Sequence, residues 1–557
     1  MTGRLRSFLS ASVLGGLFAL QMMAQQNPPA ATNSSTTAQA DSLPVFHANT
    51  RVVLLDVIVS DKKGEFVPSL KAEDFTVLED GKPQRISSFS VQRYETPKPV
   101  PKLQLPPNQF TNFSPQEPGG AVNIVMLDAL NTPLIQQTYA RKAILEFLKN
   151  LPSNQRVALF LLDDRPRLIQ GFSGSSDALI AAAKSISLTK IAPLSDPGSN
   201  IDIGGPAASS IQTALNSPIA IAAEQRLRLT IASIKALAQA VSGYTGRKNL
   251  FWLSGYFPFR LDADFNGNNN QDLLDLHKAE VVETAALLAA SQVAVYPIDV
   301  NGVEHLGGLN VVGAIDLNKP IGGRISDSWT DTASMEHLAR ETGGKAFYGS
   351  NAVGDALLHG LQQGSDYYTL AYTPENRDWN GRYRKLEVKV SAKGAKLTYR
   401  RGYYATEEKV FTGDQAARAL ATAVQATTPV STMLLMKVQV LPPDKEHKTV
   451  RIDYAVNGYD ISFGDTPGKL KHAAVDFMSV AWDKSYKSAG YQTDTVETDF
   501  QPEAYAKIMQ TGFPEHQELL LKPGTYTLRL GVIDRNSQKI GTVDVPLTVT
   551  ETETAMK

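Results

Sequence analysis

The sequence predicts an α/β protein with a doubly wound, mostly parallel sheet, flanked by a β domain on its N-terminal side and a β-sandwich on its C-terminal side. Three observations predict this. Strand and helix patterns alternate from Ala121 to about Asp366. The first strand of that region, Asn123–Leu127, is an unbroken apolar run that stops at Asp128, as expected of a strand buried on both faces. Strand patterns without helices precede and follow the alternating region.

Composition narrows the class of protein. The chain has 557 residues, too many for one hydrophobic core, and its 42% hydrophobic and 20% charged residues are typical of globular domains. A formal net charge of -1 gives no reason to expect a nucleic-acid partner. The chain has no cysteine, which excludes disulfides, thiol catalysis, thiolate metal sites and a lipid-modified cysteine anchor.

Residues 1–24 have the pattern of a secretory signal peptide. Arg4 and Arg6 form a basic start, Phe8–Leu20 an apolar middle, and Ala24 a cleavage position. The alternative is a retained membrane anchor, for which the apolar run is short. Residues 25–44 predict a disordered tether, and no later segment has the composition of a transmembrane span. We therefore expect a secreted, periplasmic or cell-surface protein.

Residues 45–95 predict the first part of a β domain. Val53–Val59 is strand-like, and the Asp80-Gly81 pair is a strong signal for a hairpin turn. So small a sheet is marginal alone, and we expect residues 367–405 to complete it. The completing strands are expected at Tyr368–Tyr372, Tyr383–Val390 and Lys396–Arg400. Residues 96–120 are rich in proline and predict an extended linker.

Residues 121–366 carry the alternating pattern of the α/β domain, which predicts right-handed crossovers and helices on both faces of the sheet. The strands are expected at Asn123–Leu127, Val157–Leu162, Asn249–Leu253, Val293–Ile298 and Lys345–Tyr348. The helices are expected at Thr138–Leu151, Ser176–Ile186, Ala222–Val241, Asp272–Ser291, Thr332–Glu341 and Val353–Gln363.

The last part of the chain is β-rich. Residues 406–430 predict a helical linker that acts as a spacer, and residues 431–557 predict an immunoglobulin-like β-sandwich without the cysteine pair. Its strands are expected at Val438–Val440, Val450–Ala455, Ala474–Trp482, Leu519–Leu521, Thr525–Ile533 and Thr542–Val549.

Several short motifs between Val45 and Ala405 resemble a known family. They are Val57–Gly64, Glu73–Gly81, Leu127–Thr132, Val295–Asp299, Tyr368–Pro374 and Arg401–Tyr404. As a set they resemble the von Willebrand factor A (VWFA)-related proteins abundant in Acidobacteria. The resemblance implies a von Willebrand A fold, export from the cytoplasm and no established substrate.

Von Willebrand A domains often hold a divalent ion in a metal-ion-dependent adhesion site (MIDAS), through which a partner's acidic side chain is bound. The resemblance places Asp128 at the aspartate position, Leu130 where the first serine belongs, Thr132 at the second serine, and Ser254 where a later aspartate is common. Gly204-Gly205-Pro206 stands in the loop that usually supplies a threonine. The site is therefore degenerate.

Other carboxylates are expected near the same edge of the sheet, because strands that run parallel end together. They are Asp163, Asp164 and Asp299. Carboxylate and hydroxyl oxygens suit a hard cation, so Mg2+ or Ca2+ is the expected ion. The alternative is that Asp128 caps the segment that comes after it and that no metal binds.

A second oxygen-rich segment resembles the opening of an EF-hand calcium loop. Asp262, Asp264 and Asn266 occupy positions 1, 3 and 5, and Gly267 occupies position 6. The closing glutamate is absent, with Leu273 at position 12. The alternative is a polar surface loop that caps the next helix.

The sequence contains no zinc-binding helix motif, nucleophile elbow or phosphate-binding loop, so we predict a protein that is not an enzyme. The first hypothesis is a protein-binding or adhesion module that engages a protein or peptide at the sheet edge around Asp128. The alternatives are a metal-independent envelope scaffold and an exported hydrolase whose site is not recognisable.

Overall fold

The computed structural model describes most of the chain after residue 50. The described ranges are 51–93, 104–113, 121–152, 155–163, 165–187, 218–257, 277–302, 321–407, 410–426, 428–466 and 470–550. Gly204-Gly205-Pro206, Asp164, and the predicted calcium loop with Asp262, Asp264 and Asn266 lie outside these ranges.

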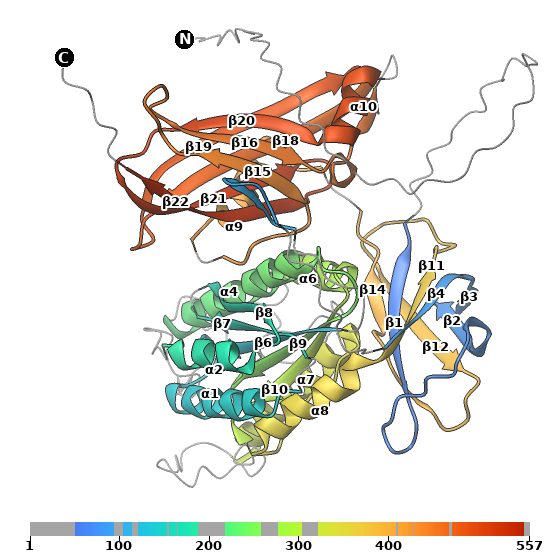
Figure 1. The fold of residues 1–557 in the computed structure, drawn as a ribbon. Helices are drawn as coiled ribbons and strands as arrows, with labels where there is room; N and C mark the ends of the chain where they lie inside the picture. Colours follow the sequence, from blue (N-terminus) through green and yellow to red (C-terminus); the bar gives the residue numbers. More distant parts are fainter. Residues whose placement is uncertain are drawn as a thin grey trace, which may run out of the picture. The chain divides into compact units, whose positions relative to one another are not determined.

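The α/β unit is built on a five-stranded sheet with the order β10-β9-β6-β7-β8 (Figure 1). The strands are β6 (Val122–Asp128), β7 (Val157–Leu162), β8 (Pro166–Ser173), β9 (Lys248–Ser254) and β10 (Val293–Asp299). All neighbours are parallel except β7 and β8, which are antiparallel. The expected mostly parallel sheet is therefore present, with an antiparallel strand at one edge.

Helices cover both faces of this sheet. Successive residues of a strand point to opposite sides, and the apolar side chains on both sides are buried under helices. The helices are α1 (Leu134–Lys149), α2 (Ser176–Ser185), α4 (Pro218–Val241), α6 (Lys278–Ala290), α7 (Ile321–Thr342) and α8 (Val353–Ser365). Ile124 and Met126 pack with α4, α6 and α7, whereas Val125 and Leu127 pack with α1, α2 and α8. The two apolar cores leave every residue of β6 buried.

The strand order reverses beside β6, and this reversal locates the expected binding edge. From β6 the chain continues to β7 on one side, whereas β9 and β10 lie on the other side. In open α/β sheets, ligands bind outside the carboxyl ends of the strands at such a switch point. Asp128 is the last residue of β6 and Ser254 the last of β9, so both lie at that point.

The N-terminal β unit combines segments from both sides of the α/β unit. Its sheets have the orders β13-β1-β11-β4 and β14-β12-β2-β3. The strands are β1 (Val53–Ser60), β2 (Phe75–Glu79), β3 (Lys82–Gln84), β4 (Ile86–Gln92), β11 (Tyr367–Tyr372), β12 (Tyr383–Val390), β13 (Lys396–Thr398) and β14 (Gly402–Tyr404). Strand β1 is antiparallel to β11 and to β13, so the α/β unit is inserted between strands of the same sheets.

A buried ion pair joins the two segments of this unit. The Glu79 carboxylate accepts hydrogen bonds from Tyr372 Oη (2.8 Å), Tyr403 Oη (2.8 Å) and Arg384 Nη1 (3.0 Å). Glu79 and Arg384 are both buried. Removing either partner would leave an uncompensated charge, so the pair favours this assembly of the two segments over alternatives.

The C-terminal unit consists of two sheets that enclose one apolar core. The first has the order β20-β16-β15-β5; the second has the order β17-β18-β21-β22, with β19 paired to β18. The strands are β5 (Gln109–Thr111), β15 (Met436–Leu441), β16 (Val450–Val456), β17 (Gly464–Thr466), β18 (Leu470–Trp482), β19 (Ser488–Phe500), β20 (Phe513–Leu519), β21 (Gly524–Asp534) and β22 (Ile540–Val549). The immunoglobulin-like assignment stays a prediction.

Two segments predicted as connectors are parts of this sandwich. Residues 109–111 of the proline-rich linker form β5, which pairs with β15, and the Asn112 side chain donates to the carbonyl oxygens of Ser431 and Leu434. Helix α9 (Gly413–Ala423) lies within the predicted spacer and packs on the second sheet through Leu420.

Other elements also differ from the predictions. The strand predicted at Lys345–Tyr348 is a single parallel bridge between Phe347 and Ile298. The strand predicted at Leu519–Leu521 lies earlier, as β20. Strands β8 and β19 and helix α10 (Pro502–Thr511) are additional to the predicted elements. Among the helices that the structure describes, none is both long enough and apolar enough to span a membrane.

Candidate functional site

Asp128 lies at the switch point of the sheet, but its side chain is enclosed. It is 0% exposed. Its position on β6 matches the parity of Ile124 and Met126, so its carboxylate faces the side of the sheet that α4 covers. The carboxylate therefore lies beneath the carboxyl edge of the sheet, with no exposed surface of its own.

Four hydrogen-bond donors surround this carboxylate. Oδ1 accepts from Asn131 N at 2.9 Å. Oδ2 lies 2.9 Å from each of three donors, which are Asn131 Nδ2, Trp252 Nε1 and Ser254 Oγ. Each carboxylate oxygen offers about two lone-pair positions, so protein donors fill the capacity of Oδ2.

Burial and hydrogen bonding act on Asp128 in opposite directions. Burial raises the pKa of the Asp128 carboxyl above its usual value of 3.8, and the hydrogen bonds from Asn131, Trp252 and Ser254 oppose that rise. The raised pKa shows that desolvation of the charged form is the larger effect.

The hydroxyl groups predicted as metal ligands form hydrogen bonds within the protein. Thr132 Oγ1 accepts from the backbone N of Gly255 at 2.9 Å. Besides Asp128, Ser254 Oγ contacts the carbonyl oxygen of Tyr256 at 2.8 Å. Leu130, at the missing serine position, is buried in the apolar core. These interactions link the segment after β6 to the segment after β9.

The segment after β10 joins the same network. Asn301 Nδ2 donates to the carbonyl oxygen of Gly255 at 2.6 Å and to Asp299 Oδ1 at 2.9 Å. A Cβ atom at Gly255 would lie 3.2 Å from Pro133 Cδ and 3.3 Å from Asn301 Oδ1, so the three segments are in close contact. Together these segments, residues 128–133, 254–257 and 299–302, form the rim of the sheet.

The described residues of the rim supply fewer oxygen ligands around Asp128 than a hard cation takes. A hard cation needs about six or more oxygen ligands, but the Asp128 oxygens face N–H and O–H donors and the Thr132 hydroxyl accepts from a backbone amide. Asp163 forms an ion pair with Arg167 of β8. Within the described ranges, no group of three or more His, Asp or Glu side chains is arranged to hold a metal.

A pocket of about 350 Å3 opens at the carboxyl end of β10. Asp299, Phe347, Tyr348, Asp355 and His359 line it, together with small apolar residues. Its volume lies within the range typical of ligand-binding pockets. Sequence reasoning missed this pocket because its walls combine the end of β10 with residues 346–359, which are distant from β10 in sequence.

Exposed apolar side chains lie at the start of α1, directly after the rim. Ile135 is 81% exposed and Leu134 is 43% exposed. Tyr139 lies one helical turn after Ile135, on the same side of α1, and its hydroxyl donates to the carbonyl oxygen of Asn351. Asn351 lies between two residues that line the pocket, Ser350 and Ala352, so α1 and the pocket share a boundary.

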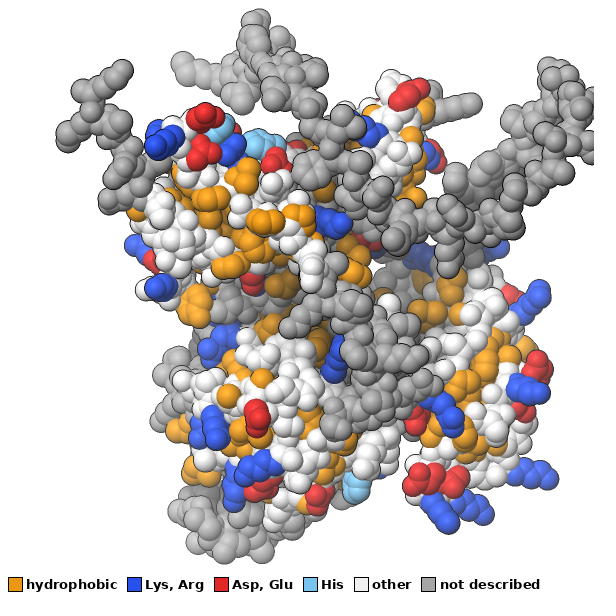
Figure 2. Space-filling view, in the orientation of Figure 1, with side chains coloured by type: hydrophobic (Ala, Val, Ile, Leu, Met, Phe, Trp, Pro, Cys, Tyr) orange, Lys and Arg blue, Asp and Glu red, His pale blue; other side chains and the backbone are white. Residues whose placement is uncertain are grey.

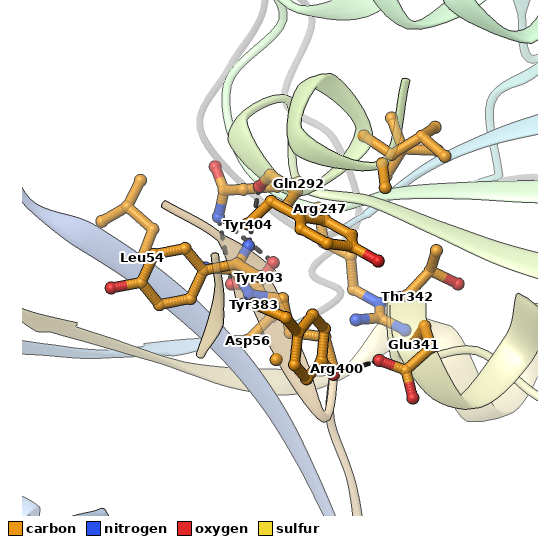
Figure 3. Close-up of a pocket in the computed structure, with 15 residues that line it drawn as sticks. Leu54, Asp56, Arg247, Gln292, Glu341, Thr342, Tyr383, Arg400, Tyr403 and Tyr404 are labelled. Atoms are coloured by element: carbon orange, nitrogen blue, oxygen red, sulfur yellow. Dashed lines mark hydrogen bonds between the residues drawn. The ribbon is translucent and has the colours of Figure 1, made fainter. Parts of the chain in front are cut away.

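The opposite, amino-terminal edge of the sheet is closed by the β unit. Figure 3 shows Asp56 of β1 and Gln292, which precedes β10, pointing toward each other; Gln292 Nε2 lies 3.1 Å from both carboxylate oxygens. Arg247, which precedes β9, donates its backbone N–H to Tyr367 Oη at 2.9 Å. The cavity there is about 30 Å3, room for roughly one or two waters.

Charge on the α/β unit is mixed. On the face turned to the viewer in Figure 2, hydrophobic, acidic and basic side chains are interspersed over the region of α1 and α2. Neither sign of charge dominates this face, which agrees with the formal net charge of -1 for the chain. A polyanion such as nucleic acid finds no basic surface on this face.

Comparison with known proteins gives structural neighbours only. No protein-family model and no curated protein sequence matches the chain. Similar solved structures include an aerotolerance-related membrane protein from Bacteroides fragilis (14% identity, 44% of this chain and 100% of that chain, TM-score 0.23). They also include BatB from Bacteroides thetaiotaomicron (14%, 44% and 97%, TM-score 0.21). The ArnB paralog VWA2 from Sulfolobus acidocaldarius is another (10%, 90% and 75%, TM-score 0.21).

Von Willebrand A proteins are thus among the similar solved structures. Identities and TM-scores this low carry no information about function. The α/β fold of this chain is established by its own strand order, register and helix packing.

Proposed function

We propose that this chain is a von Willebrand A-type protein-binding module, not an enzyme, whose recognition surface lies at the rim and the start of α1. Recognition at this surface does not use a metal ion at Asp128. The partner is a protein or peptide. Export to the periplasm or cell surface remains part of the proposal and rests on the signal-like pattern of residues 1–24.

The exposed apolar start of α1 is the observation that supports this proposal best. Ile135 is 81% exposed, although an isoleucine on a folded domain is usually buried. It lies beside Leu134 and one turn before Tyr139, whose hydroxyl bonds to Asn351 next to the pocket. An apolar cluster rimmed by polar residues is typical of an interaction site.

The hydrogen bonds of the rim support the metal-independent form of the proposal. In a metal-dependent site, the ion holds the loops together and offers an open coordination position to the partner. Here Ser254, Gly255 and Asn301 link the loops directly. A preorganised surface of this kind binds a partner without first ordering its own loops.

An ion elsewhere on the module is compatible with this proposal. The EF-hand-like segment with Asp262, Asp264 and Asn266 is a separate candidate, with Ca2+ as its expected ion. It is tested by its own substitution, Asp264→Ala, which should abolish any calcium-dependent rise in melting temperature.

A capture experiment with matched variants tests the proposal. The exported form of the chain is immobilised and exposed to an envelope extract, with and without a chelator. We expect one partner to be captured in both conditions and lost with Ile135→Glu. Leu520→Glu is the control, because Leu520 is also an exposed aliphatic residue (72%) but lies in the C-terminal unit.

Two results would contradict the proposal. One is capture that disappears with the chelator but persists with Ile135→Glu. The other is capture that Leu520→Glu weakens as much as Ile135→Glu does, because binding would then not be localised to α1.

A further inference from the structure

We infer that the pocket beside β10 binds a lysine or arginine side chain presented by the protein partner. This inference rests on the proposed function and deepens it, since it gives one anchor residue of the partner a chemical class. It is carried by the shape of the pocket, the chemistry of its walls and the position of its carboxylates.

The walls of the pocket suit an aliphatic chain. Ile298 and Phe347 contribute the sheet side, and Val353 and Ala356 contribute the side formed by α8. Apolar contacts of this kind stabilise the methylene stem of a lysine or arginine, while the charged head stays at a polar end. A bare metal ion needs no such wall and would find too few ligands.

The carboxylates of the pocket favour a cation. Asp299 is the last residue of β10 and is 6% exposed, and Asp355 lies in the first turn of α8 on the exposed side. The amino end of α8 contributes about half a positive charge, which Asp355 more than offsets. Tyr348 and His359 are the other titratable groups that line the pocket.

Two charged residues next to the lining offset each other. Lys345 Nζ lies 5.3 Å from the centroid of the Phe347 ring, and Glu336 accepts a hydrogen bond from Tyr348 Oη. With these included, the described charges around the pocket sum to roughly one and a half negative charges.

The position of the pocket favours a protein partner over a free amine. Tyr139 of α1 bonds to Asn351, which lies between the lining residues Ser350 and Ala352, so the exposed apolar stripe of α1 lies near the pocket. An apolar stripe next to an acidic pocket is complementary to a segment with an apolar residue near a lysine or arginine. Binding both groups at once gives a partner its orientation.

Small probes test the pocket without knowledge of the partner. Nα-acetyl-arginine amide, Nα-acetyl-lysine amide and Nα-acetyl-norleucine amide are titrated into the full chain, with binding followed by saturation-transfer NMR. The norleucine probe keeps the aliphatic stem and lacks the charge. We expect both cationic probes to bind in the millimolar range and the norleucine probe to bind about tenfold more weakly.

Two variants localise this binding. Asp355→Asn should weaken the cationic probes about fivefold and leave the norleucine probe unchanged. Ala352→Phe places a ring at an exposed position that lines the pocket and should abolish binding of all three probes. Glu146→Gln, which removes an exposed charge from α1, should change nothing. Unchanged melting curves establish that the variants fold.

The inference is wrong if neither cationic probe binds, if the norleucine probe binds equally well, or if binding survives both pocket variants. These outcomes are separate from failure of the proposed function. If no probe binds but capture of the partner still depends on Ile135, only the inference about the pocket is rejected. If the probes bind but capture does not depend on Ile135, the proposed partner surface at the start of α1 is rejected.

Discussion

A carboxylate at the end of a buried strand needs compensation for the water it loses, either from a cation or from hydrogen-bond donors. At Asp128 the donors come from Asn131, Trp252 and Ser254. The sequence pattern puts Asp128 and Ser254 at the same edge, and the structure brings them within 2.9 Å. The sequence pattern could not identify Asn131 and Trp252 as donors, because the spacing of oxygen ligands does not reveal which N–H groups converge on them.

At the residue scale, Asp128→Asn tests the donor arrangement. The replacing amide would bring an NH2 group toward at least one of the four donors, which would then lose its acceptor. We expect the free energy of unfolding of the α/β unit to fall by about 1–3 kcal/mol. Denaturant unfolding followed by tryptophan fluorescence measures this. Glu146→Gln serves as the exposed control, and equal stability of both variants would show that the donors do not depend on Asp128.

The pH dependence of stability gives a second test at Asp128. Its pKa is raised by burial, so the folded state binds the proton more tightly than the unfolded state does. This contribution to the free energy of unfolding is complete below the usual value of 3.8 and is lost as pH rises through the folded pKa.

The free energy of unfolding of the wild-type chain should exceed that of Asp128→Asn by less as pH rises from about 4 to 7. Urea unfolding of both proteins across this range measures the difference. An advantage that grows with pH would mean that the folded pKa is lowered and that the hydrogen-bond donors outweigh desolvation.

At the scale of elements, the strongly apolar segments were predictable and the edge segments were not. Strands β6, β7, β9 and β10 are buried along their whole length, and their apolar runs predicted them to within about a residue. Strand β19 is exposed or half-exposed throughout and contains several threonines and acidic residues, so its pattern does not distinguish it from a loop. Strand β5 depends on pairing with β15, more than 300 residues away.

Helix α9 shows how a connector pattern conceals a packed element. Its alanines indicate a spacer, but Leu420 packs on β18 and β21 and is only 1% exposed. At Gly531 of β21 a Cβ atom would lie 2.4 Å from Val424 Cγ1, so the helix end approaches the strand as closely as glycine permits. An alanine-rich pattern does not specify which surface its apolar face covers, because small side chains fit many partners.

Substitution at Leu420 tests whether α9 belongs to the sandwich. Leu420→Ala should lower the free energy of unfolding of the C-terminal unit by about 2–5 kcal/mol, because it leaves a cavity between the helix and the sheet. Arg418→Ala, on the exposed side of the same helix, should have little effect. Urea unfolding of the two variants compares them, and equal effects would restore the spacer interpretation.

At the scale of the whole molecule, the α/β unit is carried by a β unit made of two distant segments. Strand β1 pairs only with strands beyond residue 366 among the described residues. Hydrogen bonds from Gln292 to Asp56 and from Arg247 to Tyr367 join this unit to the amino-terminal edge of the sheet. The rim and the pocket lie at the carboxyl-terminal edge, where we propose that a partner binds.

The discontinuous β unit predicts the behaviour of fragments. Residues 51–93 alone keep the pairing of β2 with β3 but lose the partners of β1 and β4, and an isolated hairpin is marginal in water. We expect an undispersed NMR spectrum from this fragment, and a dispersed one when residues 367–407 are fused to it through a flexible linker. A dispersed spectrum from residues 51–93 alone would contradict the shared-sheet arrangement.

The melting temperature in the presence of divalent ions tests most directly whether the rim works without a metal at Asp128. Wild-type protein, Asp128→Ala and Asp264→Ala are melted in Mg2+, in Ca2+ and in a chelator. We predict that Asp128→Ala keeps any ion-dependent rise in melting temperature that the wild type shows. Any rise caused by Ca2+ should be lost with Asp264→Ala alone. An ion-dependent rise in melting temperature that Asp128→Ala abolishes and Asp264→Ala preserves would contradict a metal-independent rim.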